Sequence, residues 1–543
     1  MRKQVKVAIV GSVFAAMVGG AGYGTYNVVS ALTDDGGTPA GSAEVRTGPP
    51  SGAEVRDTAR KFLAAWAKGD PDLAATYTND AEAAARALTG YRDDAHIRKV
   101  RLDAGRIAGD RVPFTVRATV SYEGTSKPLA YASEFTVVRG RTTGRPLVDW
   151  KPSVVHPKLG EGESLETGEA AAPPIRAVDR HGVVLTAKRY PSLAPVLSGL
   201  RARYGERAGG RAGIELYVRR QSEDAGTTTL LTLAEGRAGR LPTTLSAAAQ
   251  RAAEDAVARH PESSVVAVKP STGEVLAVAN HRADGFNAAF EGRLAPGSTM
   301  KIVTAAMLID KGVTTAEGPA PCPATATWQS QTFHNLTGLA PRPRATLADS
   351  FARSCNTAFV KLVDEKPLTD ASLTETARDG FGIGRDDWHT GITSWDGAVP
   401  PSGGPDRAAN AIGQGQVQLN PLTLASVTAT ASTGAFRQPV VVPRALVEGE
   451  VATARGLSPR TVAQLRALMR RTAVSGTAAK AMAGLGPDVG AKTGSAEVDG
   501  QKRPNSWFTG YRGDVAAAAV AQEGGHGGDT AGPIVAAVLR AGG

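Results

Sequence analysis

The 543-residue chain is poor in cysteine and in histidine, and each shortage excludes a class of protein. Two cysteines, Cys322 and Cys355, are too few for the disulfide framework that holds small secreted domains together. The sequence does not decide whether these two cysteines form a disulfide, because spacing alone does not show whether their Cα atoms approach within about 7 Å. The eight histidines lack metal-ligand spacing, so the sequence predicts neither a metal site nor another cofactor.

The chain also lacks a long basic run and internal repeats. Its 62 basic and 52 acidic residues give a net charge of +10, which indicates a mixed, solvated surface. This pattern does not indicate a nucleic-acid-binding protein. The net positive charge is consistent with attraction to anionic polymers of the cell envelope. A chain of this length with 42% hydrophobic and 21% charged residues should fold into about two to four domains.

A long uncharged stretch lies close to the N-terminus. Its length of about 26 residues, positions 7–32, is enough to span a bilayer. Three basic residues precede it and two acidic residues follow, so the positive-inside rule predicts that residues 1–33 are a cytoplasmic stub and transmembrane anchor. A cleaved secretory signal is the alternative, although its apolar region is usually shorter. Both alternatives make the bulk of the protein extracytoplasmic.

The sequence next predicts a linker and one small domain. Residues 34–51 are rich in glycine, proline and serine and lack periodic apolar positions, which is typical of a linker. Helical periodicity then predicts helices to about Val100, and alternating segments at 113–122 and 132–140 predict antiparallel strands. We therefore expect an α+β domain over residues 52–155.

The remaining sequence contains a middle module and a large domain. Residues 156–240 include an acidic, Gly- and Pro-rich linker, 158–174, followed by a small pedestal-like or dimerisation-like module. Residues 241–543 combine helices, a hairpin around Pro270–Gly273, three successive C-terminal strands and a closing helix. The predicted fold class is multidomain α+β, with an antiparallel sheet between helical layers in the largest domain.

The segment LAPGSTMKIVTAAML, residues 294–308, places Ser298 three residues before Lys301 at the expected start of a helix. Ser298 is a good N-cap there and equally well placed as a nucleophile, because the free N–H groups and the dipole of a helix start stabilise developing negative charge. Lys301 lies one turn further on the same face. Its ordinary pKa is near 10.4, so it can act as a base at pH 7 only if burial or a second cation lowers that pKa.

Two further motifs supply candidate partners. Lys492, Thr493 and Gly494 lie on the expected strand VGAKTGSAEV, where the lysine is a second cation, the threonine can bond a carboxylate and the glycine lets a ligand approach the backbone. Ser354 and Asn356 are two residues apart, so they can share a ligand only if a helix begins at about Asn356. Each motif alone also has an ordinary explanation, as a surface lysine or a helix cap.

Together and in this order, the three motifs resemble those of the penicillin-binding proteins. Residues 413–425, GQGQVQLNPLTLA, resemble the Gly-Gln-Gly segment of their transpeptidase domains. Residues 173–186 resemble a signature of the monofunctional, class B members, with Ala177 and His181 in place of the usual glycine and asparagine. Residues 52–155 resemble the nuclear-transport-factor-2-like (NTF2-like) domain that some class B proteins carry. The resemblance implies a serine β-lactamase-like fold for the largest domain.

The resemblance also implies a reaction, the crosslinking of peptidoglycan stem peptides that end in D-Ala-D-Ala. Ser298 would attack the carbonyl of the penultimate D-alanine and form an acyl-enzyme while Lys301 takes its proton. Ser354 would pass a proton to the leaving D-alanine. An amine of a neighbouring stem would then close the crosslink, and β-lactams would inhibit the enzyme by acylating the same serine.

For substrate binding, the resemblance implies five further residues on two segments. Asn356 would hold the amide of the donor peptide. Lys492 and Thr493, followed by Gly494, would bind its terminal carboxylate. The backbone N–H groups of Ser298 and Ser495 would form the oxyanion hole, in which each such donor is worth on the order of 100-fold in rate.

Three alternatives share parts of this pattern. A β-lactamase needs a positioned general base, and Gln416, in a segment similar to Glu-x-x-Leu-Asn, has an amide where a carboxylate is required. A D,D-carboxypeptidase, which passes the acyl group to water, differs only in the shape of its cleft. A membrane-anchored β-lactam sensor would need a cytoplasmic signalling portion, and only about six residues precede the expected span. We also expect no glycan-polymerising domain, so a separate partner would supply glycan strands.

Overall fold

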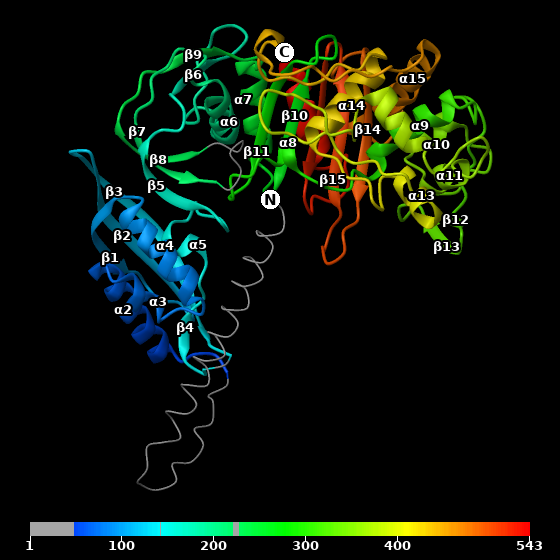
Figure 1. The fold of residues 1–543 in the computed structure, drawn as a ribbon. Coiled ribbons are helices and arrows are strands. Elements are labelled where there is room, and N and C mark those ends of the chain that lie inside the picture. The colour runs from blue at the N-terminus through cyan, green and yellow to red at the C-terminus, as the bar shows by residue number, and fades with distance from the viewer. Residues whose placement is uncertain (1–47, 142, 221–226, 543) are drawn as a thin grey trace, which may run out of the picture.

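The computed structural model describes residues 48–141, 143–220 and 227–542 (Figure 1). The predicted membrane anchor, residues 1–33, lies outside these ranges. Within them, no helix is both long enough and apolar enough to cross a bilayer. Figure 1 shows the middle module lying between the N-terminal domain and the large C-terminal domain.

The N-terminal domain packs helices against a four-stranded antiparallel sheet in the order β1-β2-β3-β4. Helix α2 starts at a capping box formed by Ser51 and Glu54 and stops at Gly69, which adopts the left-handed conformation that favours glycine. Phe62 and Trp66 on its apolar face pack into the core of the domain. The elements are α2 (Gly52–Lys68), α3 (Pro71–Ala75), α4 (Ala81–Asp93), β1 (Ile97–Ala104), β2 (Arg111–Tyr122), β3 (Thr125–Arg139), β4 (Pro146–Val148) and α5 (Pro152–Val155).

The helical region of this domain ends earlier than the sequence pattern predicts. The prediction of helix to about Val100 is wrong beyond Asp93, because strand β1 follows and pairs antiparallel with β2. Pairing with a neighbouring strand thus overrides the local helical periodicity. The strands expected at 113–122 and 132–140 are confirmed in β2 and β3.

The middle module contains two small sheets and one long helix. Its antiparallel sheet β5-β7-β8 packs Leu165, Leu216 and Leu233 into the core of the N-terminal domain. The prediction of a linker over 158–174 is therefore wrong for residues 164–169, whose buried positions alternate as in a half-buried strand. The elements are β5 (Ser164–Glu169), β6 (Ile175–Val178), η1 (Pro191–Leu193), α6 (Ala194–Tyr204), β7 (Ile214–Arg219), β8 (Thr228–Ala234) and β9 (Gly239–Pro242).

The buried carboxylate of Asp179 joins the middle module to the C-terminal domain. Its Oδ1 accepts the backbone N–H groups of His181 and Val183, both at 2.8 Å, and its Oδ2 accepts that of Ala247 at the start of α7, at 2.9 Å. His181 contributes only its backbone to this contact. A residue other than asparagine at position 181 therefore leaves the turn intact.

The C-terminal domain is built on a five-stranded antiparallel sheet in the order β11-β10-β16-β15-β14. Helices α7 and α17 pack on one face, and α14 packs against the other. The predicted hairpin, the three C-terminal strands and the closing helix are confirmed as β10–β11, β14–β16 and α17. The elements are α7 (Ala247–Val257), β10 (Ser263–Val268), β11 (Val275–His281), α14 (Pro421–Thr433), α15 (Pro459–Ser475), β14 (Val489–Ala496), β15 (Asn505–Arg512), β16 (Val515–Ala521) and α17 (Ala531–Ala541).

Shorter elements between these carry Ser298, Lys301 and Asn356. They are α8 (Ala288–Glu291), η3 (Gly297–Met300), α9 (Lys301–Asp310), β12 (Thr325–Trp328), β13 (Gln331–His334), α10 (Leu347–Ala352), α11 (Asn356–Leu362), α12 (Ser372–Glu375), η4 (Thr376–Gly380), α13 (Gly404–Ala411), η5 (Arg444–Leu446) and α16 (Ala479–Met482). Figure 1 shows α9, α10, α11, β12 and β13 on the β14 side of the sheet.

Candidate active site

Ser298 lies in a single 3-10 turn, η3, that leads directly into α9. The prediction that Ser298 caps this helix is wrong: Pro296 is the N-cap residue, and Ser298 is already inside the turn. The physical cause is Gly297, whose positive φ of 54° turns the chain one residue before the serine and whose N–H donates to Gly413 O at 2.8 Å. The Ser298 hydroxyl is consequently left for Lys301, whose Nζ donates to Oγ at 2.9 Å.

Lys301 is completely buried and its ammonium is fully coordinated. Its Nζ donates to Ser298 Oγ at 2.9 Å, to Ser354 O at 2.9 Å and to Asn356 Oδ1 at 2.6 Å. Burial, and secondarily the positive charge of Lys492, hold the pKa of Lys301 well below its ordinary value. Lys301 therefore loses its proton more readily than an ordinary lysine and lies next to Ser298, as a base at this position requires.

Ser354 connects the two lysines. Its backbone carbonyl accepts from Lys301, and its Oγ accepts from Lys492 Nζ at 2.8 Å. The residue adopts φ of +60°, a left-handed conformation that a serine rarely takes. Helix α11 begins at Asn356, as the sequence predicts, so Ser354 reaches both lysines from the turn before the helix and Asn356 reaches Lys301 from the first residue of the helix.

Lys492 lies on edge strand β14 and is also completely buried. Its Nζ donates to Ser354 Oγ and to Thr493 O, both at 2.8 Å, and burial lowers its pKa to about 7. The neighbouring Thr493 shares a 2.6 Å hydrogen bond with the hydroxyl of Thr477. A ligand at β14 would therefore meet Thr493 directly and Lys492 mainly through its charge.

Gly494 and Ser495 complete the site on the strand next to the Ser298 turn. A Cβ at Gly494 would lie 2.9 Å from Pro296 O and 2.9 Å from Thr299 Cγ2. The glycine therefore allows β14 to pack closely on η3. This packing requires a glycine at position 494 whether or not a ligand approaches the backbone, which was the reason that the sequence indicated. Ser495 follows and is half-buried, with its backbone oxygen packed against Gly297.

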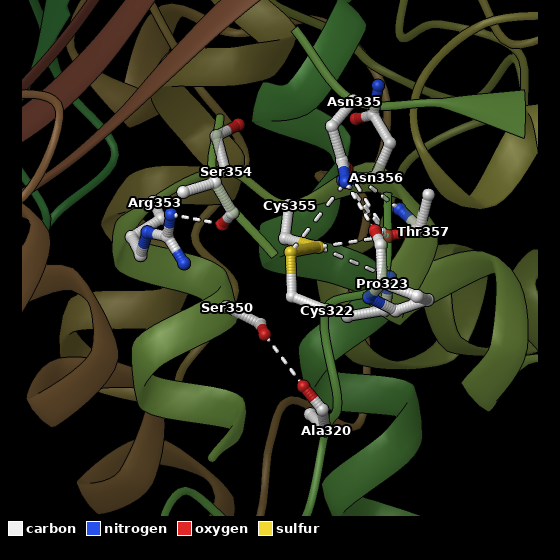
Figure 2. Close-up of a disulfide and its surroundings, with 12 residues drawn as sticks. Ala320, Cys322, Pro323, Asn335, Ser350, Arg353, Ser354, Cys355, Asn356 and Thr357 are labelled. Carbon is white, nitrogen blue, oxygen red and sulfur yellow. Dashed lines mark hydrogen bonds between the residues drawn. A yellow bond between two sulfur atoms is a disulfide. The ribbon is translucent and has the colours of Figure 1, made fainter. Parts of the chain in front are cut away.

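The two cysteines form a disulfide, which the spacing of the sequence left open. Cys322 and Cys355 are bonded with their Cα atoms 6.1 Å apart, and both are completely buried. Cys355 lies between Ser354 and Asn356, so the bond fixes the middle of this motif to the segment ahead of β12 (Figure 2).

Sequence reasoning missed Asn335, which follows β13. Its Oδ1 accepts the N–H of Asn356 at 2.8 Å and that of Thr357 at 3.1 Å, and its Nδ2 donates to Pro323 O at 2.8 Å (Figure 2). A lone asparagine after a short strand carries no sequence signal, because its role depends on a segment 21 residues away.

Gln416, which stood where a β-lactamase would need a carboxylate, is exposed. Its Nε2 donates to Asp406 Oδ2 at 2.8 Å. In the part of the chain that the structure describes, no group of three or more His, Cys, Asp or Glu side chains could hold a metal ion. The candidate site brings together Ser298, the buried Lys301 and Lys492, and Ser354, which are side chains of the kind that a serine acyltransferase uses.

Comparisons with known proteins identify the class. Residues 263–540 match the penicillin binding protein transpeptidase domain, and residues 54–163 match the NTF2-like N-terminal transpeptidase domain. The chain belongs to the penicillin-binding protein transpeptidase family. The family and the NTF2-like character of the N-terminal region, both predicted from the sequence, are confirmed.

The chain is similar to curated and solved members of this family. Peptidoglycan D,D-transpeptidase PbpA of Mycolicibacterium smegmatis is 30% identical over 369 residues, covering 56% of this chain and 74% of that protein. PbpA of Mycobacterium tuberculosis H37Rv is 28% identical over 363 residues, covering 56% and 72%. The structure of Pseudomonas aeruginosa PBP2 in complex with WCK 5153 covers 68% of this chain and 96% of that chain, with a TM-score of 0.54 and 21% identity.

The D,D-transpeptidase domain of a peptidoglycan glycosyltransferase from Eggerthella lenta is also similar in structure. It covers 68% of this chain and 98% of that chain, with a TM-score of 0.52 and 21% identity. At these identities, the two solved structures support the multidomain fold alone.

Proposed function

We propose that this peptidoglycan D,D-transpeptidase works through an acyl-enzyme on Ser298. The observation that carries the proposal is the Lys301 ammonium, which is buried and 2.9 Å from Ser298 Oγ, with a pKa well below that of an ordinary lysine. The family and the D,D-transpeptidase activity named for both PbpA proteins support the assignment.

In the first half-reaction, Ser298 Oγ forms a bond to the carbonyl carbon of the penultimate D-alanine. Once Lys301 has lost a proton, its Nζ becomes an acceptor and takes the hydroxyl proton of Ser298. The negative charge that develops on the carbonyl oxygen is stabilised by the backbone N–H groups of Ser298 and Ser495. The peptide bond to the terminal D-alanine then breaks, and the acyl-enzyme remains.

The leaving D-alanine needs a proton on its nitrogen. Ser354 Oγ supplies it and is resupplied by Lys492, whose Nζ is 2.8 Å away and whose pKa of about 7 makes it a moderate acid. In the second half-reaction, an acceptor amine loses its proton by the reverse route and attacks the acyl carbon.

Substrate recognition follows from the position of β14 at the edge of the sheet. The donor stem peptide adds to this edge as an extended strand, which satisfies its backbone groups. Asn356 holds the donor amide, while Thr493 binds the terminal carboxylate under the positive charge of Lys492. The flanking Gly494 and Ser495 keep the strand close to the Ser298 turn.

The cellular setting follows from the uncharged N-terminal stretch, residues 7–32, and from the family. We assign the protein a single-pass anchor with the N-terminus in the cytoplasm and the catalytic domain outside the cell membrane. A separate protein supplies the glycan strands. A structure of a peptidoglycan synthase complex that coordinates polymerization and crosslinking has the same fold over 70% of this chain, with a TM-score of 0.53.

One experiment separates the transpeptidase from a D,D-carboxypeptidase. The soluble part of the chain, beginning near Asp34, is given a donor stem peptide and an acceptor amine, and the products are weighed by mass spectrometry. A transpeptidase yields the crosslinked mass and free D-alanine. Release of the shortened donor alone, at every acceptor concentration, would assign the carboxypeptidase instead.

A further inference from the structure

The turn formed by Ser354, Cys355 and Asn356 holds both lysines of the site. Three of its atoms accept from lysine Nζ atoms: the carbonyl oxygen and Oγ of Ser354, and Oδ1 of Asn356. Ser354 also has a left-handed backbone, which costs free energy and persists only where its surroundings impose it. The turn therefore needs a support outside itself.

Its own helix cap is a poor support. Cys355 is the N-cap residue of α11, and its sulfur, a weak acceptor, lies 3.4 Å from the N–H of Ala358. The first N–H groups of a helix have no acceptor within the helix. Here two of them, from Asn356 and Thr357, donate to the side-chain oxygen of Asn335.

Asn335 thus acts in place of the N-cap from outside the helix. Its amide nitrogen is also bound, because Nδ2 donates to Pro323 O at 2.8 Å and to Thr357 Oγ1 at 3.0 Å. Pro323 directly follows Cys322, whose disulfide to Cys355 enters the same turn. Figure 2 shows the amide of Asn335 and the disulfide meeting the turn together.

We propose that Asn335 and the Cys322–Cys355 disulfide form one positioning clamp for the Ser354–Asn356 turn. Asn335 fixes the start of α11 by hydrogen bonds, and the disulfide fixes the same turn covalently. This role rests on the proposed function, in which Ser354 and Asn356 act on the donor peptide. Asn335 is a positioning residue, since it reaches the substrate only through the turn.

The test compares three substitutions of Asn335. Asn335→Leu keeps the size of the side chain and removes its hydrogen bonds, and Asn335→Ala removes both the size and the hydrogen bonds. Asn335→Asp keeps an oxygen acceptor at the start of α11, where a negative charge is favourable. Rapid kinetics with a fluorescent penicillin separate the dissociation constant of the noncovalent complex from the acylation rate constant. Gln331→Ala, on the exposed face of β13, is the matched control.

We expect the acylation rate constant to fall by roughly 10- to 100-fold in the Leu and Ala variants, because small misplacements of reacting groups cost rate on this scale. The Asp variant should recover only part of the loss, because it keeps the acceptor for the Asn356 and Thr357 N–H groups while its second oxygen faces Pro323 O without a proton to donate. The control should match the wild type. Equal rates for the Leu variant and the wild type would overturn the role of Asn335.

A double-mutant cycle tests whether the two parts act as one clamp. It combines Asn335→Leu with Cys322→Ala/Cys355→Ala, and rates are expressed per folded, titratable site. Coupled parts give a combined loss clearly smaller than the product of the separate losses. A loss equal to that product would overturn the shared role. Ser298→Ala, measured in parallel, distinguishes this failure from that of the proposed function, because labelling of that variant would contradict the acyl-enzyme itself.

Discussion

Replacing Gly494 by alanine tests how tightly the substrate strand must lie on the nucleophile turn. The new Cβ would lie 2.9 Å from Pro296 O, 2.9 Å from Thr299 Cγ2 and 3.0 Å from Trp507 Cβ. Nonbonded carbon atoms prefer roughly 3.5–4.0 Å, so β14 and η3 would have to separate by about half an ångström. None of the three neighbouring atoms is the end of a flexible side chain, and the strain therefore reaches the backbone.

The expected cost follows from this displacement. Overpacking of a buried position typically costs about 1–3 kcal/mol of stability. A shift of this size would move the two proposed oxyanion donors, the N–H groups of Ser298 on η3 and Ser495 on β14, apart, and should lower acylation by roughly 10- to 100-fold. We would measure the second-order rate of labelling by a fluorescent penicillin, together with thermal unfolding.

The matched control is Gly168→Ala, also in a strand. A Cβ there has Tyr122 Oη at 3.9 Å as its nearest neighbour, an ordinary contact. The control should label at the wild-type rate. Wild-type labelling by Gly494→Ala as well would refute the close packing of β14 on the Ser298 turn as a requirement of the site.

Three further predictions concern the lysines and the disulfide. Because the pKa of Lys301 is held well below its ordinary value, the acylation rate should rise with pH, as this base loses its proton, over a range well below that in which an ordinary lysine titrates. The rate should fall above about pH 7 as Lys492 loses its charge, and a flat profile in stopped-flow labelling would contradict both roles. Below pH 7 both the folded and the unfolded chain keep the Lys492 proton, and between about pH 7 and 10.5 only the unfolded chain keeps it. Burying the ammonium therefore lowers the free energy of unfolding by its full amount at pH 6, and this loss becomes smaller, by about 1.4 kcal/mol per pH unit, as the pH rises above 7. Lys492→Met should therefore abolish activity while raising the unfolding temperature more at pH 6 than at pH 9, and the opposite order would refute the assignment. Cys322→Ala/Cys355→Ala should lower the free energy of unfolding by about 2–4 kcal/mol in denaturant titrations. A reducing agent present during unfolding and refolding should lower the stability of the wild type and leave that of the variant unchanged.

The sequence predicts the contacts between neighbouring residues of the site well. It predicts the contacts between distant segments only through the resemblance to the penicillin-binding proteins. The spacing of Ser298 and Lys301 is enough to place their side chains together, because residues three apart share a helix face. No such rule connects them with Ser354, in the turn before α11, or with Lys492 on β14. Their convergence follows from the order of motifs in a known family.

The errors have local physical causes. Ser298 has the residue type of an N-cap, but the left-handed Gly297 is already the first residue of the helical turn, and Pro296 is its N-cap. The alanine-rich helical pattern continues to about Val100, yet pairing with β2 makes a strand there. Asn335 was missed because its contacts depend on how the segment between Cys322 and Asn356 folds back.

The most direct test of the account is the intact mass of the protein after reaction with a β-lactam. We expect the wild type to gain the mass of one penicillin, with the adduct on the peptide that contains Ser298, and Ser298→Ala to gain none while retaining the wild-type unfolding temperature. A folded Ser298→Ala variant that still gains the mass, or an adduct on another residue, would contradict the assignment of Ser298 as the acylated nucleophile.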